Sequence, residues 1–206
     1  MRLEIISYSR TTRYCTNGQW YKGGMKTPIR LLFLPLIFAC CAVTVNAQQA
    51  PAKTPGFRDL FLDPLKDVEG KVVSLAEAMP QEKYTWRPAD GVRSVSEVFT
   101  HIAGANYMLP NFIGIKPPAG MSPALAKETD KAKVVEALKA SFEHLRQGVM
   151  NMADADLEKP VKLFGRATNY EGVLFLIANH MHEHLGQSIA YARTNGVTPP
   201  WSKKGD

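Results

Sequence analysis

The chain has 206 residues, of which 45% are hydrophobic and 21% are charged, and its formal net charge is +6 at pH 7. This is enough chain for one domain that buries a core without disulfides or metal staples. Most of the positive excess lies before residue 48, so the rest is nearly neutral and the net charge does not indicate a nucleic-acid-binding protein.

The N-terminal region has the sequence features of an export signal. The segment Leu31–Val45 is almost wholly apolar, but it is interrupted by Pro35 and is shorter than the roughly 20 apolar residues of a membrane span. Arg30 supplies a positive flank, and Ala47 ends a small-residue cleavage pattern. We predict a signal peptide over residues 1–47, and therefore a periplasmic or secreted protein with no stable membrane span in its mature form.

Two details of this region leave alternatives open. Met25 directly precedes the signal pattern, so residues 1–24 can be a misassigned upstream start. Residues 37–40 resemble a lipobox, which gives lipoprotein anchoring as the less favoured alternative because Phe38 fits that motif poorly. All three cysteines precede residue 48, so the mature chain has no disulfide, thiol nucleophile or cysteine ligand.

The mature chain begins with a leader over residues 48–56, followed by one domain over residues 57–206. Asp63-Pro64 is a helix-start signal, and Pro80 ends the first predicted helix. Apolar residues recur between them at alternating spacings of three and four, which is the stripe of an amphipathic helix: Leu65, Val68, Val72, Leu75 and Met79.

A capping box predicts the start of the second helix. A turn with aromatic anchors, Tyr84 to Pro88, precedes Ser94, and Glu97 follows three residues later. In this motif the two side chains satisfy the first free amides of a helix. We expect this helix to end near Pro110.

A connection rich in proline, residues 110–130, leads to two further helices. Its length is typical of functional or bundle-crossing connections, and we expect it to help cover a pocket. The third helix follows the apolar stripe from Val134 to Met152, and the fourth runs from a capping box at Thr168–Glu171 to Gly196. No stretch alternates long enough for a sheet, so the predicted fold is an all-α four-helix bundle.

Histidines mark the candidate site. His180 and His184 are four residues apart in the last helix, so they share one face and can reach one metal ion. His101 lies on the core-facing stripe of the second helix. Three neutral imidazoles suit zinc or nickel, with manganese as an alternative, and leave a position for water or substrate. An equally simple interpretation is a packed core pair without metal.

Other histidines and acids are assigned to packing or surface positions. His182 lies on a different face from its neighbours, and His144 lies beside the apolar stripe of the third helix. A zincin motif is excluded because Met181, and not glutamate, follows His180. Glu183 is therefore interpreted as a solvated side chain.

Two stretches resemble the signatures of the DinB family, also called the DinB/YfiT-like metalloenzymes. They are SVSEVFTHIAGA, which begins at Ser94, and HMHEHLGQSIAYAR, which begins at His180 and is followed by NGVTPP. The resemblance covers residues 57–201. It implies a four-helix bundle with a divalent metal on one histidine of the second helix and two of the fourth, which are His101, His180 and His184 by motif position.

The resemblance also implies two classes of activity, a thiol-dependent S-transferase or a metal-dependent hydrolase acting on a small molecule. Export away from the cytoplasmic thiol pool favours hydrolysis or simple binding. No catalytic residue is assigned; Asn106, Tyr107 and Gln187 are candidate contacts of the ligands or substrate. The alternative is a non-catalytic metal- or ligand-binding protein whose site is saturated, for example through Glu97. We also expect a homodimer.

Overall fold

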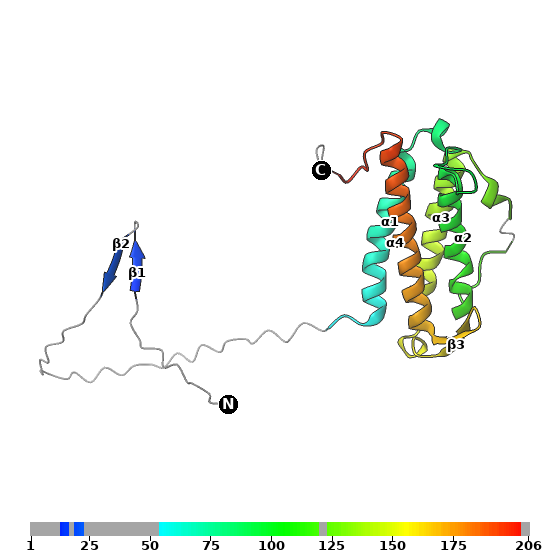
Figure 1. Ribbon diagram of the computed structural model, residues 1–206. Helices are drawn as coiled ribbons and strands as arrows, with labels where there is room; N and C mark the ends of the chain where they lie inside the picture. Colours follow the sequence, from blue (N-terminus) through cyan, green and yellow to red (C-terminus); the bar gives the residue numbers. More distant parts are fainter. Residues whose placement is uncertain (1–12, 17–18, 23–53, 120–122, 203–206) are drawn as a thin grey trace, which may run out of the picture. The chain divides into compact units, whose positions relative to one another are not determined.

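The computed structural model describes residues 13–16, 19–22, 54–119 and 123–202 (Figure 1). The chain divides into two compact units, Met1–Ala50 and Pro51–Asp206. The described residues of the first unit form an antiparallel hairpin of β1 (Arg13–Thr16) and β2 (Gln19–Lys22). The apolar segment and cleavage pattern of the predicted signal peptide lie outside the described residues, so export stays a prediction.

The described part of the second unit holds four α-helices that form a bundle. They are α1 (Phe57–Ala78), α2 (Val95–Met108), α3 (Lys131–Met150) and α4 (Tyr170–Thr194). Each packs against two neighbours, in the ring order α1, α3, α2, α4 (Figure 1). A cluster of buried apolar side chains from all four fills the centre. None of the described helices is long and apolar enough to cross a membrane.

The first helix begins earlier than its sequence signal. The Gly56 N–H donates to Asp59 Oδ2 over 3.3 Å at the start of α1, and Pro64 lies inside the helix. The predicted start at Pro64 was therefore wrong. Proline cannot donate to the carbonyl of Leu60, but Leu60 is 58% exposed, so its side of the helix faces water. Burial of Phe61 holds this first part of the helix against the core.

The second helix confirms its predicted capping box. Ser94 Oγ accepts the N–H of Glu97 over 3.3 Å, and Glu97 Oε2 accepts the N–H of Ser94 over 2.7 Å. A short 3₁₀ turn, η1 (Gln81–Lys83), precedes it. The Tyr84 hydroxyl, which is buried, donates to the Ala76 carbonyl over 2.8 Å and ties this turn to α1.

The connection from α2 to α3 packs on the bundle. It contains two 3₁₀ turns, η2 (Pro110–Ile113) and η3 (Pro123–Lys127), and η3 lies against α2. Ile115 seats directly on α3, because a Cβ added at Gly148 would lie 2.4 Å from Ile115 Cγ2. Because Gly148 has no side chain, the connection can pack closely against α3 at this point.

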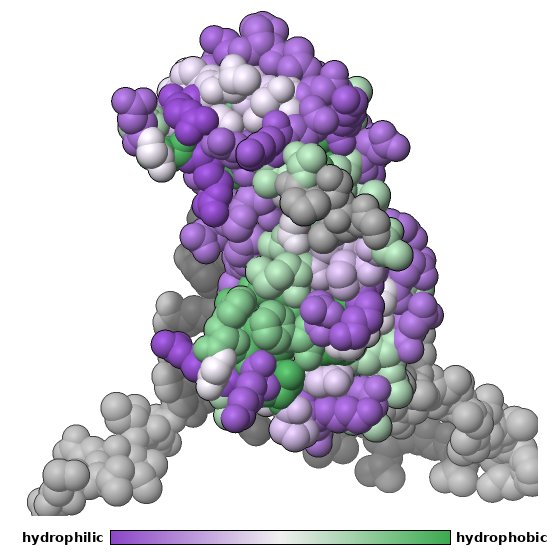
Figure 2. Space-filling model, turned by 90° about the vertical axis from the view of Figure 1, so that its right-hand side faces the viewer, coloured by the Kyte–Doolittle hydropathy of each residue, from purple (hydrophilic) through white to green (hydrophobic). Residues whose placement is uncertain are grey.

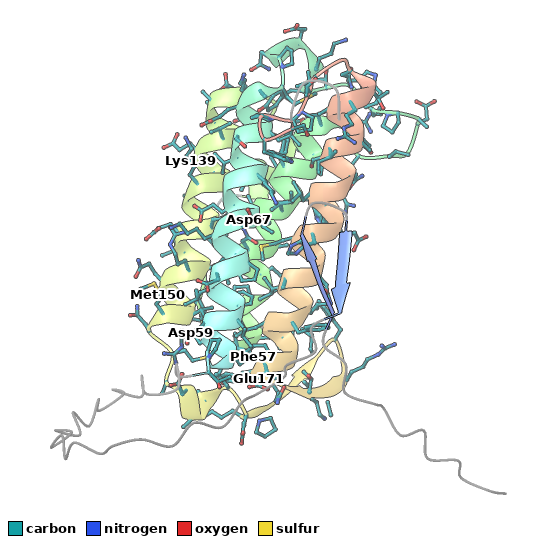
Figure 3. The ribbon with its side chains drawn as sticks, turned by 90° about the vertical axis from the view of Figure 1, so that its left-hand side faces the viewer. Phe57, Asp59, Asp67, Lys139, Met150 and Glu171 are labelled. Carbon is teal, nitrogen blue, oxygen red and sulfur yellow. The ribbon has the colours of Figure 1, made fainter. Side chains whose placement is uncertain are left out.

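The surfaces of α1 and α3 are joined by ion pairs. Lys139 Nζ of α3 lies 2.7 Å from Glu77 Oε1 of α1. Arg146 of α3 pairs with Glu69 of α1 and with Glu143 of its own helix. Figure 3 shows these two helices side by side, with Lys139 on the outer surface. An exposed pair such as Lys139 with Glu77 contributes little to stability, so the apolar core carries the packing.

A short hairpin precedes the last helix. After η4 (Asp154–Asp156), β3 (Pro160–Leu163) pairs antiparallel with β4 (Arg166–Asn169). The prediction of no sheet was wrong here, since four-residue strands are too short to show alternation. At the turn, Phe164 and Gly165 have φ values of 48° and 82°. In Figure 2, hydrophobic residues gather toward the end of the bundle that carries β3.

The last helix begins one residue later than predicted. Asn169, and not Thr168, caps α4, because Asn169 Oδ1 accepts the N–H of Gly172 over 2.9 Å. Thr168 ends β4 and pairs with Val161. The helix ends at Thr194, and Gly196 follows with a φ of 75°, as the predicted glycine termination requires.

Candidate metal centre

The three predicted histidines come together where α2 meets α4. His101 lies in the middle of α2, and His180 and His184 lie one turn apart on α4. One ring nitrogen of each lies within 4.8 Å of the others, and the Nε2 atoms of His101 and His180 are 3.0 Å apart. In the part of the chain that the structure describes, no other group of three His, Cys, Asp or Glu side chains lies close enough to share an ion.

The buried face of α4 carries this pair inward. Val173 and Ile177 precede the histidines on that face and are buried, and His184 is only 7% exposed. His182 and Glu183, between the two ligands in sequence, are exposed. The prediction that the His180 and His184 stripe points into the bundle is therefore confirmed.

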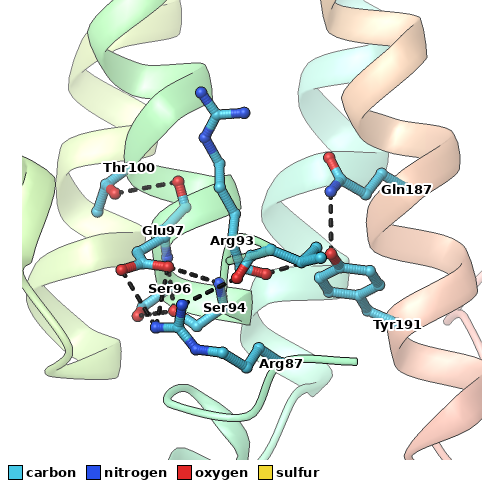
Figure 4. A network of polar contacts seen from close by, with 9 residues as sticks. Arg87, Arg93, Ser94, Ser96, Glu97, Thr100, Gln187 and Tyr191 are labelled. Carbon is cyan, nitrogen blue, oxygen red and sulfur yellow. Dashed lines mark hydrogen bonds and ion pairs between the residues drawn. The ribbon is translucent and has the colours of Figure 1, made fainter. Parts of the chain in front are cut away.

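A chain of hydrogen bonds places a proton on Nδ1 of His184. The backbone carbonyl of Arg93 can only accept, so the Tyr191 hydroxyl donates to it over 3.2 Å. Gln187 Nε2 donates to the same hydroxyl over 3.0 Å (Figure 4), which leaves Gln187 Oε1 2.8 Å from His184 Nδ1. Since Oε1 is an acceptor, Nδ1 carries the proton and the Nε2 lone pair of His184 is free.

The rings of His101 and His180 are held in their neutral form. The pKa of His101 is lowered from 6.5 to about 4, first by burial and then by the positive charge of Arg93 and the neighbouring rings. The pKa of His180 is also lowered, first by burial and then by His184 and Arg93, against an opposite effect of Glu183. Metal ions bind the neutral imidazole, so these rings are ready to coordinate at neutral pH.

The donor set fits a divalent ion. Two nitrogens at tetrahedral positions on zinc, with bonds of about 2.0–2.1 Å, lie roughly 3.3 Å apart. The 3.0 Å between the Nε2 atoms of His101 and His180 is close to that spacing. Imidazole donors suit zinc, copper and nickel, and a three-histidine set without a carboxylate leaves room for an exchangeable ligand.

Other candidate residues lie elsewhere. Asn106 is buried and donates to Ser141 Oγ of α3 over 3.1 Å, and the Tyr107 ring packs on His144 of α3 with a centroid distance of 5.0 Å. Both therefore join α2 to α3, and among the described residues no hydrogen bond or ring contact links either of them to the histidine cluster. Glu97 stays in its capping box and accepts an ion pair from Arg87 at 3.2 Å, so it does not complete the site.

Sequence reasoning missed Arg93 and the role of Tyr191. Trp86 packs edge-on against the Tyr191 ring, with centroids 5.4 Å apart, and so holds the hydrogen-bonded chain in place. The spacing of four residues between Gln187 and Tyr191 indicates that they share a helix face. No pattern joins Tyr191 to Arg93, which lies 98 residues earlier in the chain.

Comparisons with known proteins identify the family and agree with the four-helix fold. A family model described as the DinB superfamily matches residues 65–188. A DinB-like protein of Bacillus cereus is 20% identical, with a TM-score of 0.63 over 70% of this chain and 97% of its own. The DinB-like protein YjoA of Bacillus subtilis is 19% identical, with a TM-score of 0.57 over 71% and 99%.

A third similar structure is YfiT of Bacillus subtilis, described as a probable metal-dependent hydrolase with an unusual four-helix bundle topology. It is 16% identical, with a TM-score of 0.56 over 72% of this chain and 94% of its own. At these identities the likeness is one of fold. No curated protein sequence matches the chain.

Proposed function

This chain belongs to the DinB superfamily, and on that premise we propose that it is a metal-dependent hydrolase of a small molecule. His101, His180 and His184 are the proposed ligands of a divalent ion, zinc or nickel first. The observation that carries the proposal is the convergence of three ring nitrogens within 4.8 Å. The description of YfiT as a probable metal-dependent hydrolase supports the same reaction class.

The protein residues have distinct tasks in this proposal. When bound, a divalent ion with three protein ligands supplies Lewis acidity and an acidified water at its open position. His101 from α2 and the pair from α4 hold that position at the helix interface. Gln187 keeps the proton of His184 on Nδ1, so that Nε2 faces the cluster. Ala126 of η3 lines a pocket beside His101, as expected if the connection helps to cover the site.

The proposal is tested first by metal content. Tag-free full-length protein is incubated with zinc, nickel and manganese, dialysed and measured by elemental mass spectrometry, beside His101→Ala and His184→Ala. His182→Ala is the matched control, because His182 is an exposed histidine of α4 that bonds only the Ala178 carbonyl of its own helix. We expect near-stoichiometric metal in wild type and in the control, and loss in both ligand variants.

Catalysis needs a second measurement. A panel of small esters, amides and lactones is incubated with metal-loaded protein, and hydrolysis is followed by mass spectrometry. Turnover that is lost in His101→Ala and kept in His182→Ala supports the hydrolase. A second result favours the non-catalytic binding role: the protein binds metal but shows no turnover, and the cobalt-substituted protein shows no exchangeable water on the metal. Absence of metal in wild type overturns both.

We also propose export, on the evidence of the apolar segment Leu31–Val45 and the cleavage pattern that ends at Ala47. The N-terminal sequence of protein recovered from the periplasm or medium tests this. An N-terminus at Gln48 supports it, whereas an uncleaved chain retained in the cytoplasm contradicts it.

A further inference from the structure

A pocket opens beside the histidine cluster. Its volume is about 430 Å³, and His101 belongs both to its wall and to the cluster. Thr100 lines it from α2 and Ala126 lines it from η3. A small molecule in this pocket is therefore in contact with one of the proposed metal ligands.

The pocket contains two arginines in different situations. Arg87 is engaged, because Arg87 Nη2 lies 3.2 Å from Glu97 Oε2 and Nη1 donates to the Val92 carbonyl over 2.9 Å. The guanidinium of Arg93 makes no ion pair or hydrogen bond with any described residue; only its backbone carbonyl is used. Figure 4 shows the Arg93 side chain extended between α2 and α4, with no contact drawn to its guanidinium.

Arg93 lies beside the histidine cluster, because it lines the same pocket as His101, which belongs to the cluster. The carboxylate of Glu97, which also lines the pocket, is already balanced by Arg87. The pocket is consequently positive beside the cluster, even before any cation is bound.

Such an arrangement favours a particular ligand. A guanidinium is a fork of donors that matches the two oxygens of a carboxylate or phosphate. The positive Arg93 guanidinium would repel a metal ion bound at the neighbouring histidine cluster, and an anion bound between the two would relieve that repulsion. The backbone of Arg93 is fixed by Tyr191, in the same hydrogen-bonded chain that orients His184.

We propose that this pocket binds the anionic end of the substrate, a carboxylate or a phosphate, on the Arg93 guanidinium. The rest of the small molecule then lies against His101 and the histidine cluster. This inference rests on the proposed function and adds to it the substrate class, a small organic anion.

The test follows the side chain itself. Full-length ¹⁵N-labelled protein, metal-free and zinc-loaded, is titrated with succinate, inorganic phosphate and neutral succinamide while the arginine Nε–Hε resonances are recorded by NMR. The Arg93 resonance is assigned by its loss in Arg93→Gln. We expect it to shift saturably with succinate or phosphate and not with succinamide. The stronger of the two anions identifies the class.

The anion affinities of variants are measured in the same titration. They are followed by the resonances of the other pocket residues, because the Arg93 signal is absent from Arg93→Gln. Arg93→Gln should weaken anion binding about tenfold or more, and Arg93→Lys should weaken it less, because lysine keeps the charge but not the fork. Arg166→Gln, which alters an exposed arginine of β4, should bind as wild type.

The two proposals fail in different ways. An Arg93 resonance that moves with neither anion, in both metal states, overturns the anion pocket, and so does an Arg93→Gln variant that binds as tightly as wild type. Histidine ring signals that do not respond to zinc overturn the metal function instead. The titration of metal-free protein then still decides the pocket.

Discussion

His184 and Gln187 lie three residues apart on α4 and are joined by a 2.8 Å hydrogen bond between Nδ1 and Oε1. The bond has a direction, because the chain of donors from Gln187 through Tyr191 ends on a backbone carbonyl that can only accept. The histidine therefore receives its orientation from a part of the fold that is itself fixed by the loop before α2.

Removal of this acceptor should weaken metal binding. In Gln187→Leu the Nδ1 proton of His184 loses its partner, and we expect the zinc affinity to fall about 10- to 100-fold. Gln187→Glu keeps an acceptor at the same place and should retain most of the affinity. Competition with a chromophoric chelator measures both. Equal affinities in Gln187→Leu and wild type would contradict a positioning role.

The capping box of α2 should contribute measurably to stability. Ser94→Ala removes the acceptor for the Glu97 N–H, and we expect it to lower the free energy of unfolding by about 1 kcal/mol. Ser74→Ala is the control, because its hydroxyl bonds the Lys71 carbonyl within α1 and caps nothing. Urea unfolding of metal-free protein compares the two, and equal losses would speak against the cap.

Acid should destabilise the protein partly through His144. Burial lowers the pKa of His144, which packs on Tyr107 of α2, below its usual value of 6.5. Below pH 6.5 the unfolded chain therefore binds a proton that the folded chain does not, so stability falls as the pH falls through this window. It levels off only once the folded histidine also titrates.

Replacement of the His144 ring measures its contribution to the loss of stability in acid. We expect His144→Gln to lose less stability than wild type between pH 7 and pH 5 in urea unfolding of metal-free protein. His182→Gln, at an exposed position, should keep the wild-type pH dependence. An identical pH dependence in His144→Gln and wild type would rule out the effect of burial.

Two helical glycines should respond to alanine in opposite directions. Gly70 of α1 has no atom within 4 Å of an added Cβ, so Gly70→Ala should raise stability by about 0.5–1 kcal/mol. At Gly148 the added Cβ would overlap Ile115, so Gly148→Ala should be destabilising. Thermal unfolding measures both, and Ile115→Ala should relieve the cost of Gly148→Ala.

Much of the bundle was predictable because its signals are local. The Ser94 and Glu97 capping box and the glycine after α4 each need only a few neighbouring residues. The Asp63-Pro64 signal misled because an exposed helix face tolerates a proline that a buried one does not. The β3–β4 hairpin was missed because its strands are too short for periodicity, and its clearest sign is the Phe164-Gly165 turn.

The candidate site was predictable only in part. The spacing of His180 and His184 along one helix and the place of His101 on the core-facing stripe of another made all three candidates, and the family resemblance supported the same set. Arg93 and its link to Tyr191 depend on how a loop meets α4, across 98 residues of sequence. Sequence periodicity carries no information at that separation.

The histidine cluster joins residues that are far apart in the sequence and are therefore translated at different times. His101 and His180 are separated by 79 residues, and α4 is the last of the four helices to leave the ribosome. A metal held by all three histidines can be captured only after α4 has docked against α2. Metal binding would then follow folding and stabilise only a bundle that already contains all four helices. A chain whose synthesis stops before α4 would bind no ion at this site.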